Sequence, residues 1–413
     1  MKIRLRPLEY ILHAYMLVLL SSGFLPLLQL MRTGSAADLV EGDPLTRFLL
    51  LLGYGLSLPF LLIKPRQALH ELAGAPWVWA LIGFAVLSLF WSQLPLLTLR
   101  RSVETLLAAL YALILIQRFT LAESLKLFGW VFMLMMIASL LMIIFLPDWG
   151  IMKEPHPGAW QGIFTHKNVL GRITILSLLI FIILFFSERS IQRLFWGVGI
   201  GITVVILLGS RSSTALVLTF TVILAIAIAP LLTPLNKRSN FLSLLLVCIF
   251  GLLSLWILFY TYIDILSLLG KDPTLTGRII LWENSLRLGF ERPWIGWGFG
   301  TFWLGWQGPS AQIWSAVLWE PPHGHNGYLD LFLQLGFVGL FLGLALFYQS
   351  GKQLAKAFWR YKINWQVSFL FGLWVLLLVY NMNESAFLRQ NNILWTMLVW
   401  LSFSANKMWL YEQ

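Results

Sequence analysis

The sequence has little charge and almost no cysteine. Charged residues make up 11% of its 413 residues, whereas hydrophobic residues make up 59%. Because a soluble domain carries about 25% charged residues, this composition excludes an ordinary soluble protein and indicates that the lipid bilayer is its solvent. The single cysteine, Cys248, excludes an intrachain disulfide.

Long apolar runs take the place of the missing charge, and each is long enough to cross a hydrocarbon core of about 30 Å as a helix. They predict an all-α, polytopic integral membrane protein in which residues 1–413 form a single transmembrane domain with about 12 spans. The predicted spans are 8–31, 45–63, 76–92, 97–117, 125–146, 168–186, 191–209, 213–232, 240–263, 327–348, 365–381 and 391–409. The basic N-terminal region has no small-residue cleavage site, which favours a retained first helix over a removed signal peptide.

Acidic residues are scarce on one side of this predicted topology. The side with both termini carries 16 basic and five acidic residues, whereas the opposite side carries 13 of each. Since basic excess marks the cytoplasmic side, both termini are predicted to be cytoplasmic. The net charge of +11 is thereby explained by topology, and a nucleic-acid partner is not predicted.

Residues 264–326 form the largest predicted external loop, between spans nine and ten. Within it, residues 277–291 predict an amphipathic helix, because Ile279, Trp282, Leu286 and Phe290 fall on one arc. Such a helix is expected to lie along the membrane surface or over the mouth of the bundle. The loop is also rich in tryptophan, which is common at lipid headgroup depth and stacks on sugar rings.

Residues 322–330 place two histidines, an asparagine and an aspartate where this loop enters span ten. A membrane-protein loop needs no such cluster for stability, so we interpret it as a site of chemistry at the membrane surface. The His323-x-His325 spacing suggests a metal, but no Asp-x-Asp or Glu-x-x-His partner accompanies it, and no metal is predicted.

Further ionisable and amide groups lie on the same external side, near the ends of spans. Such groups at a bilayer edge are costly and usually functional. A single arginine there more often extends to headgroup phosphates, and a tryptophan-rich loop is usually an interfacial belt; several such groups together favour a site. These residues are Arg101, Lys167, Asn168, Arg172, Arg211, Arg278, Glu384 and Arg389.

Several motifs resemble the O-antigen ligase/polymerase superfamily of Wzy- and WaaL-like membrane proteins. They are Gly277-Arg278 with Trp282, residues 293–298, His325-Asn326-x-Tyr328-Leu329, and Gly336 with Gly339. Gly162-x-Phe164-x-His166-Lys167-Asn168 and Asn383-Glu384-Ser385 resemble its exopolysaccharide-polymerisation, ExoQ-like branch.

This resemblance implies a GT-C-type helical bundle in the bacterial inner membrane with a periplasmic active site. It also implies a donor glycan carried by undecaprenyl pyrophosphate and an acceptor that is another glycan or lipid A core. No metal, nucleotide sugar or other cofactor is expected. Membrane lipids are expected partners, and a chain-length regulator is a possible one.

The residues fit this chemistry independently of the resemblance. A leaving pyrophosphate gains negative charge, which arginine stabilises by bidentate hydrogen bonding. Arg211 and Arg278 are the first candidates, and Lys167, Arg172 and Arg101 the second. His325 is predicted to take the proton of the acceptor hydroxyl, with Asn326 or Asp330 orienting it. Asn326, Asn168, Glu384 and Trp282 are predicted to bind substrate. Direct displacement with inversion is implied by the resemblance.

The predicted function is therefore a glycan polymerase or an O-antigen ligase, which differ in their acceptor. Lys167-Asn168 and residues 383–385 favour the polymerase. The alternative is a membrane transporter of a small anion such as bicarbonate, and a weaker one is a scaffold or flippase partner. A transporter is expected to have paired half-helices and charges near the middle of its spans, and the sequence indicates neither.

Overall fold

The computed structural model describes residues 6–24, 44–228, 278–317, 319–361 and 364–410. Over these ranges the chain is helical, and its β-structure is one isolated bridge between Ile151 and Trp160. The helices are α1 (Arg6–Leu20), α3 (Pro44–Ser57), η1 (Leu58–Ile63), α4 (Pro65–Ala73), α5 (Pro76–Leu87), η2 (Ser88–Phe90), α6 (Pro95–Arg118), α7 (Leu121–Phe145), α8 (Pro147–Gly150), α9 (Lys167–Ser187), α10 (Ser190–Gly209), α11 (Ser213–Ile228), α13 (Arg278–Gly289), η4 (Gly305–Gln307), α14 (Ala311–Ala316), α15 (Gly327–Tyr361), α16 (Trp365–Asn383) and α17 (Ile393–Leu410).

Helices occupy 11 of the 12 predicted span positions, and the ninth, 240–263, lies outside the described residues. Within the described chain, six helices are long and apolar enough to cross a membrane, or seven if α4 and α5, bent by 85°, form one span. The all-helical, multi-span prediction is confirmed, but the number twelve is not. Two helices at predicted span positions fail this test for a simple reason: α6 carries Arg100, Arg101 and Glu104, and α17 carries Asn406 and Lys407 near its end.

Local sequence signals explain where many of the helices begin. Proline occupies the first turn of α4, α5 and α6, where its missing N–H costs no hydrogen bond. Thr120 and Glu123 form a capping box at α7, and Asn364 caps α16. These signals set boundaries, whereas the packing of apolar faces supplies most of the stability.

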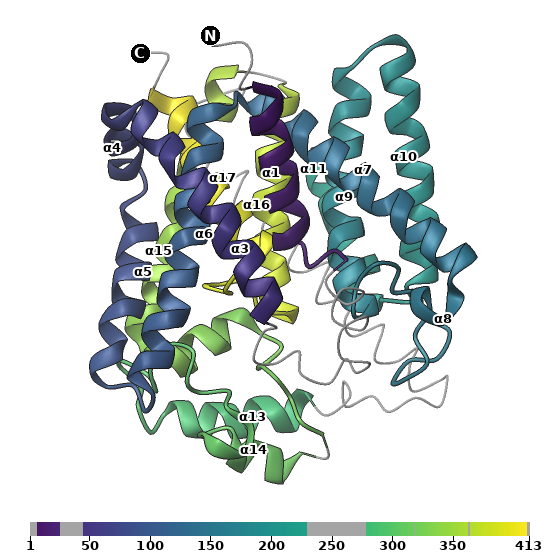
Figure 1. Cartoon of the computed structure of the whole chain (residues 1–413). Coiled ribbons are helices and arrows are strands. Elements are labelled where there is room, and N and C mark those ends of the chain that lie inside the picture. Colours follow the sequence, from purple (N-terminus) through teal and green to yellow (C-terminus); the bar gives the residue numbers. More distant parts are fainter. Residues whose placement is uncertain (1–5, 25–43, 229–277, 318, 362–363, 411–413) are drawn as a thin grey trace.

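The bundle has two ends of different character (Figure 1). The start of α1 and the end of α17 lie at one end, and α13 and α14 lie at the other. Most helices share one core, whose largest fully buried side chains include Trp395, Trp400 and Tyr111. A second, smaller core fastens α13 and α14 to the start of α15 through Leu281, Leu288 and other apolar side chains. Residues 278–317 and 319–326 therefore form a folded cap on the bundle.

Helix α13 begins at Arg278 and ends at Gly289, close to the predicted 277–291. The face that packs inward carries Leu281, Ser285 and Leu288. The predicted apolar arc points outward instead: Ile279, Leu286 and Phe290 are exposed, and Trp282 is half-buried. Phe290 contacts Phe337 of α15 edge-on, so the exposed arc continues onto the surface of that spanning helix.

Helix α15 is broken at Gly336, where φ is 65° and ψ is −163°. The segment 293–298 inserts at the break, and four backbone hydrogen bonds of 2.7–3.2 Å join them: Phe337 N to Pro293 O, Val338 N to Trp294 O, Trp297 N to Leu333 O and Gly298 N to Gln334 O. A Cβ atom on Gly296 would lie 2.4 Å from the backbone of Gln334, so glycine is required there. The break separates the part of α15 that enters the cap from the part that spans the bundle.

Candidate functional site: a histidine–glutamate pair beside basic residues

The histidine loop is shaped by the start of α15. The side-chain oxygen of Asn326 accepts the N–H groups of Tyr328 and Leu329, each at 3.1 Å, and so caps this helix. His325 has a left-handed φ of 48°, which is uncommon for a residue with a Cβ and marks a position held by its surroundings. The predicted substrate contact of Asn326 is thus accompanied by a structural role that already occupies its oxygen.

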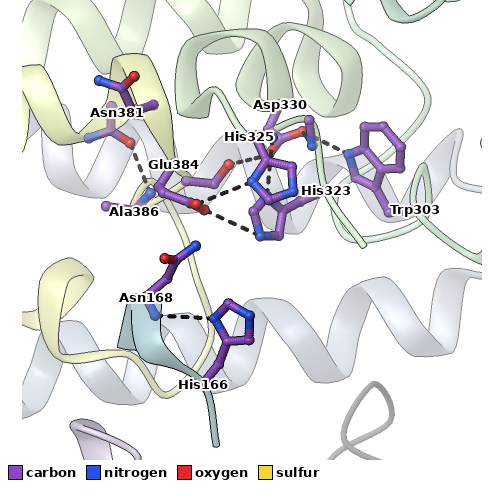
Figure 2. A network of polar contacts seen from close by, with 12 residues as sticks. His166, Asn168, Trp303, His323, His325, Asp330, Asn381, Glu384 and Ala386 are labelled. Carbon is purple, nitrogen blue, oxygen red and sulfur yellow. Dashed lines mark hydrogen bonds and ion pairs between the residues drawn. The ribbon is translucent and has the colours of Figure 1, made fainter. Parts of the chain in front are cut away.

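The connection between α16 and α17 brings a carboxylate to this loop. The side-chain oxygen of Asn381 accepts the N–H groups of Ala386 and Phe387 at 2.9 and 3.3 Å. The chain therefore bends directly after α16, and Glu384 at its C-terminus faces the histidine loop, as Figure 2 shows. Glu384 is only 9% exposed.

Glu384 is the centre of a cluster of basic groups. Its Oε1 lies 3.2 Å from His325 Nδ1, and its Oε2 lies 3.6 Å from His323 Nε2 (Figure 2). Arg278 approaches more loosely, with Nη2 at 3.9 Å from Oε1 and Nη1 donating to the Asn383 carbonyl at 3.4 Å. The hydrogen-bond partner of His325 is therefore Glu384, not Asn326 or Asp330 as the sequence analysis proposed, because those two side chains are engaged with backbone and with other side chains.

The hydrogen bonds define where the ring protons sit. His323 Nδ1 accepts the backbone N–H of His325 at 3.1 Å, so the neutral ring carries its proton on Nε2, facing the carboxylate. With Glu384 ionised, His325 Nδ1 carries a proton and donates it to Oε1. His325 Nε2 then holds a free lone pair, and this atom is buried with no hydrogen-bond partner among the described residues.

The charge states of the cluster follow from burial and neighbours. Burial opposes ionisation of Glu384, but the hydrogen bond from His325, followed by the charges of His323, His325 and Arg278, outweighs it and lowers the pKa of this carboxyl to about 2. Burial and then the charge of Arg389 lower the pKa of His323 well below its ordinary value. At neutral pH the cluster therefore holds an ionised Glu384 beside a neutral His323.

Asp330 holds the histidine loop against its surroundings. Its Oδ1 accepts the Gly324 N–H at 2.9 Å and the Trp303 indole N–H at 2.7 Å, and its Oδ2 accepts the Ser385 hydroxyl. Trp282 adds a bond from its indole N–H to the Gly324 carbonyl at 2.7 Å. Asp330 and Trp282 thus position the loop from both sides of Gly324, and Asp330 also ties it to the α16–α17 connection.

A polar pocket lies next to Glu384, between α9, α11 and α16. It is lined by Asn168, Arg172, Ser212, Thr214, Tyr380 and Glu384, with apolar Ile175, Ala215 and Leu218. The Ser212 hydroxyl donates to the Asn168 side chain at 3.2 Å. Arg172 Nε is buried without a hydrogen-bond partner in the described part of the chain, so the guanidinium retains donor capacity beside an acidic group.

His166 and Lys167 border this pocket at the start of α9. His166 Nδ1 accepts the Asn168 N–H at 3.1 Å and caps the helix (Figure 2). Burial, followed by the charges of His156 and Lys167, lowers the pKa of His166 to about 4. His166 is consequently neutral at physiological pH, and Lys167 directly precedes the pocket residue Asn168 in the chain.

The other predicted basic residues lie differently. Arg211 is exposed in the α10–α11 turn, with a left-handed φ of 49°, beside Gly158 and next to the pocket residue Ser212. Arg101 donates to the Gly300 carbonyl, which fastens the cap to α6. The structure therefore gathers His325, Glu384, Arg278 and Trp282 with Asn168 and Arg172, places Arg211 at the edge, and engages Arg101 elsewhere.

Sequence reasoning missed the partner of His325 and the place of His323, Trp303 and Ser385. The motif at residues 383–385 carried a signal, since an Asn-Glu-Ser triplet between two spans has no packing purpose there. Glu384 is 59 residues from His325 in the chain, so no local spacing could reveal their contact.

A metal site also has to be considered. Among the described residues, His323, His325 and Glu384 place their ligand atoms within 4.8 Å of one another, close enough to hold a metal ion. The third group, Glu384, was predicted from the sequence to bind substrate but not to join His323 and His325. However, His323 Nε2 carries a proton while Nδ1 accepts the backbone N–H, and a metal ligand needs a lone pair at that atom. The observed hydrogen bonds therefore do not fit a metal held through His323.

The sequence is similar to that of proteins involved in polysaccharide production and ligation. Residues 196–344 match the model of a family described as O-antigen ligase. The chain is 27% identical over 306 residues to the exopolysaccharide production protein ExoQ of Rhizobium meliloti, an alignment that covers 70% of this chain and 67% of that protein. It is also 31% identical over 91 residues, 21% of this chain and 22% of the other, to a Rickettsia conorii protein named as a polysaccharide ligase. These matches confirm the resemblance that the motifs indicate: residues 196–344 are similar to an O-antigen ligase domain, and the chain as a whole is similar to an exopolysaccharide production protein.

Proposed function

We propose that the protein is a membrane glycosyltransferase that moves a glycan from undecaprenyl pyrophosphate to an acceptor sugar hydroxyl at the periplasmic face. The observation that carries this proposal is the His325–Glu384 pair. A carboxylate holds one ring nitrogen at 3.2 Å, and the other ring nitrogen is buried with no partner in the described residues. This is the arrangement of a general base whose orientation and tautomer are fixed by an acid.

The proposed reaction is one displacement. The acceptor hydroxyl gives its proton to His325 Nε2, and its oxygen forms a bond to the anomeric carbon of the donor glycan. The bond from that carbon to the pyrophosphate oxygen breaks, and the electron pair leaves with the pyrophosphate. Attack opposite the leaving group inverts the anomeric carbon. Glu384 stabilises the imidazolium that forms on His325.

Cationic groups next to the pair suit the leaving group. Arg278 lies against Glu384, and Arg172 has a buried donor without a protein partner in the described ranges. Lys167 and Arg211 add charge at the pocket edge. The pocket also includes Asn168 and Thr214, from the first turns of α9 and α11, and helix N-termini favour anions. These features support a pyrophosphate site without a metal or other cofactor.

A polymerase and a ligase differ in the acceptor to which they transfer the glycan. The ExoQ relative, named for exopolysaccharide production, aligns over most of both chains, which favours a polymerase whose acceptor is another lipid-linked glycan. The ligase form transfers to lipid A core instead. The proposed location is the bacterial inner membrane, with cytoplasmic termini, periplasmic chemistry, and a chain-length regulator as a further partner.

Transfer in membranes tests the proposal. Vesicles containing wild type, His325→Ala or His70→Ala receive undecaprenyl-pyrophosphate-linked repeat units, with EDTA present. His70 is the matched control, because it is exposed on α4 near the opposite end of the bundle. We expect longer lipid-linked glycans from wild type and His70→Ala, and about 10²–10⁴-fold slower transfer from His325→Ala.

Two results would contradict this proposed mechanism. Wild-type rates for a normally inserted His325→Ala would remove the base, and loss of wild-type activity with EDTA would require a metal. A small-anion transporter is less well supported, because the break in α15 is filled by residues 293–298 instead of lining a charged cavity at the middle of the bundle.

A further inference from the structure

The tryptophans of the cap differ in what their indole N–H groups contact. Trp282, Trp297, Trp303 and Trp314 each donate to a protein oxygen at 2.7–3.0 Å. Trp294 and Trp306 are 69% and 61% exposed, so their N–H groups reach the surroundings of the protein. Trp319 belongs to neither group.

Trp319 Nε1 is buried, yet it has no acceptor in the part of the chain that the structure describes. The side chain is half-buried and packs against the small core of the cap. An indole N–H shielded in this way loses its hydrogen bond to water without a replacement, which is costly. The neighbouring tryptophans of the cap all avoid this cost. Trp319 is therefore the one among them whose N–H would gain a hydrogen-bond acceptor from a ligand.

The second unpartnered atom lies on the adjacent ring. The rings of Trp319 and His325 have centroids 5.5 Å apart at an interplanar angle of 47°, and His325 Nε2 is also a buried nitrogen without a hydrogen-bond partner among the described residues. One of these atoms is a donor and the other, in the tautomer that Glu384 sets, an acceptor. A hydroxyl group can accept one hydrogen bond and donate another, so a sugar can satisfy both atoms.

We propose that Trp319 forms the acceptor-sugar subsite of this protein. Its N–H, which lies in the plane of the ring, donates to an acceptor hydroxyl oxygen, and the adjoining ring edge contacts the same sugar. The reacting hydroxyl, which is this group or its ring neighbour, then points its proton at His325 Nε2. The inference rests on the proposed function, because it needs His325 to act as the base, and it assigns the acceptor and not the donor to Trp319.

The test separates acceptor from donor by using two different molecules. The donor is the host's undecaprenyl-pyrophosphate-linked repeat unit at saturation, and the acceptor probe is the soluble oligosaccharide released from that lipid by mild acid. Trp319→Phe removes the N–H and keeps an aromatic ring, whereas Trp319→Ala removes both. Trp306→Phe is the matched control, because Trp306 lies in the same cap and is exposed.

We expect Trp319→Phe to raise the acceptor KM about 3–10-fold, as loss of one hydrogen bond predicts. Trp319→Ala should raise it about 10–100-fold through the added loss of ring contact. Donor KM should stay unchanged, and Trp306→Phe should match wild type in both constants. Trp319→Tyr provides a second conservative variant if Trp319→Phe is not inserted normally.

An unchanged acceptor KM in Trp319→Phe, with His325→Ala inactive, would overturn the subsite while leaving the proposed function intact. A rise confined to the donor KM would overturn it as well. If wild type transfers nothing, the proposed function fails. Direct binding of the soluble oligosaccharide to purified protein then tests whether Trp319 contacts the acceptor sugar. Equal affinity of wild type and Trp319→Phe for that probe would then reject that contact.

Discussion

Two buried glutamates at opposite ends of the bundle have very different surroundings. Among the described residues, Glu9, at the start of α1, is held by Arg118: Nη2 lies 2.7 Å from Oε1, and Nε donates to Oε2 at 3.1 Å. Glu384, at the end of α16, is approached by His325, His323 and Arg278 at 3.2, 3.6 and 3.9 Å. The first is a closed bidentate pair, and the second is a looser cluster.

The two glutamates differ in how completely the hydrogen-bonding groups around them are paired. The Glu9–Arg118 pair satisfies its carboxylate and most of its guanidinium, and Arg118 also lies over the Phe60 ring. The Glu384 cluster has buried nitrogens on His325 and on nearby Arg172 without partners among the described residues. Buried unpartnered nitrogens also occur near Glu9, on His13. What distinguishes the Glu384 cluster is that it borders a pocket, which indicates a site built for a ligand.

Replacing Glu384 gives the largest expected contrast with Glu9. In Glu384→Gln the side chain can no longer stabilise an imidazolium, and its amide can donate to Nδ1 and thereby move the ring proton to Nε2. We expect transfer to slow about 10²–10⁴-fold, as measured by single-turnover rates in membranes. Activity within about threefold of wild type would show that the carboxylate has no part in the reaction.

Replacing Glu9 tests the structural half of the comparison. Glu9→Gln leaves the Arg118 guanidinium partly buried without its counter-charge, so we expect the protein to lose about 1–3 kcal/mol of stability. Transfer should remain near the wild-type rate at temperatures where the variant is folded. The measurement is thermal unfolding in detergent, alongside the same rate assay. A large loss of activity without a loss of stability would contradict the assignment of this pair to structure alone.

A smaller effect should appear in the pH dependence of stability. His166 has a pKa of about 4 in the folded protein, against an ordinary value of about 6.5 in the unfolded chain. Between these values the unfolded state binds more protons, so acidification from pH 6.5 to 4 favours unfolding. His166→Asn keeps a side chain that caps α9 and removes this titration. Its melting temperature should therefore fall less than that of wild type over this range, and an identical fall would contradict the burial of His166.

Much of the fold could be predicted because each membrane helix depends mainly on the hydropathy of its own stretch of sequence. Apolar runs located helices at all 11 of the predicted positions that the structure describes, and the motif residues His325 and Glu384 were both named as site residues. The break in α15 was not predicted, since Gly336 alone could not reveal that 293–298 would supply its hydrogen bonds. Which carboxylate contacts His325 also depends on packing between α15 and α16, and Asp330, only five residues away in sequence, was the natural but incorrect choice.

The central claim is that His325 and Glu384 act as one unit, and a double-mutant cycle tests it most directly. Single-turnover transfer would be measured for wild type, His325→Ala, Glu384→Gln and the double variant. Residues that act together are strongly non-additive, so we predict that Glu384→Gln slows wild type by about 10²-fold or more but slows His325→Ala by less than about twofold. Equal slowing in both backgrounds would contradict the account, because Glu384 would then contribute independently of His325.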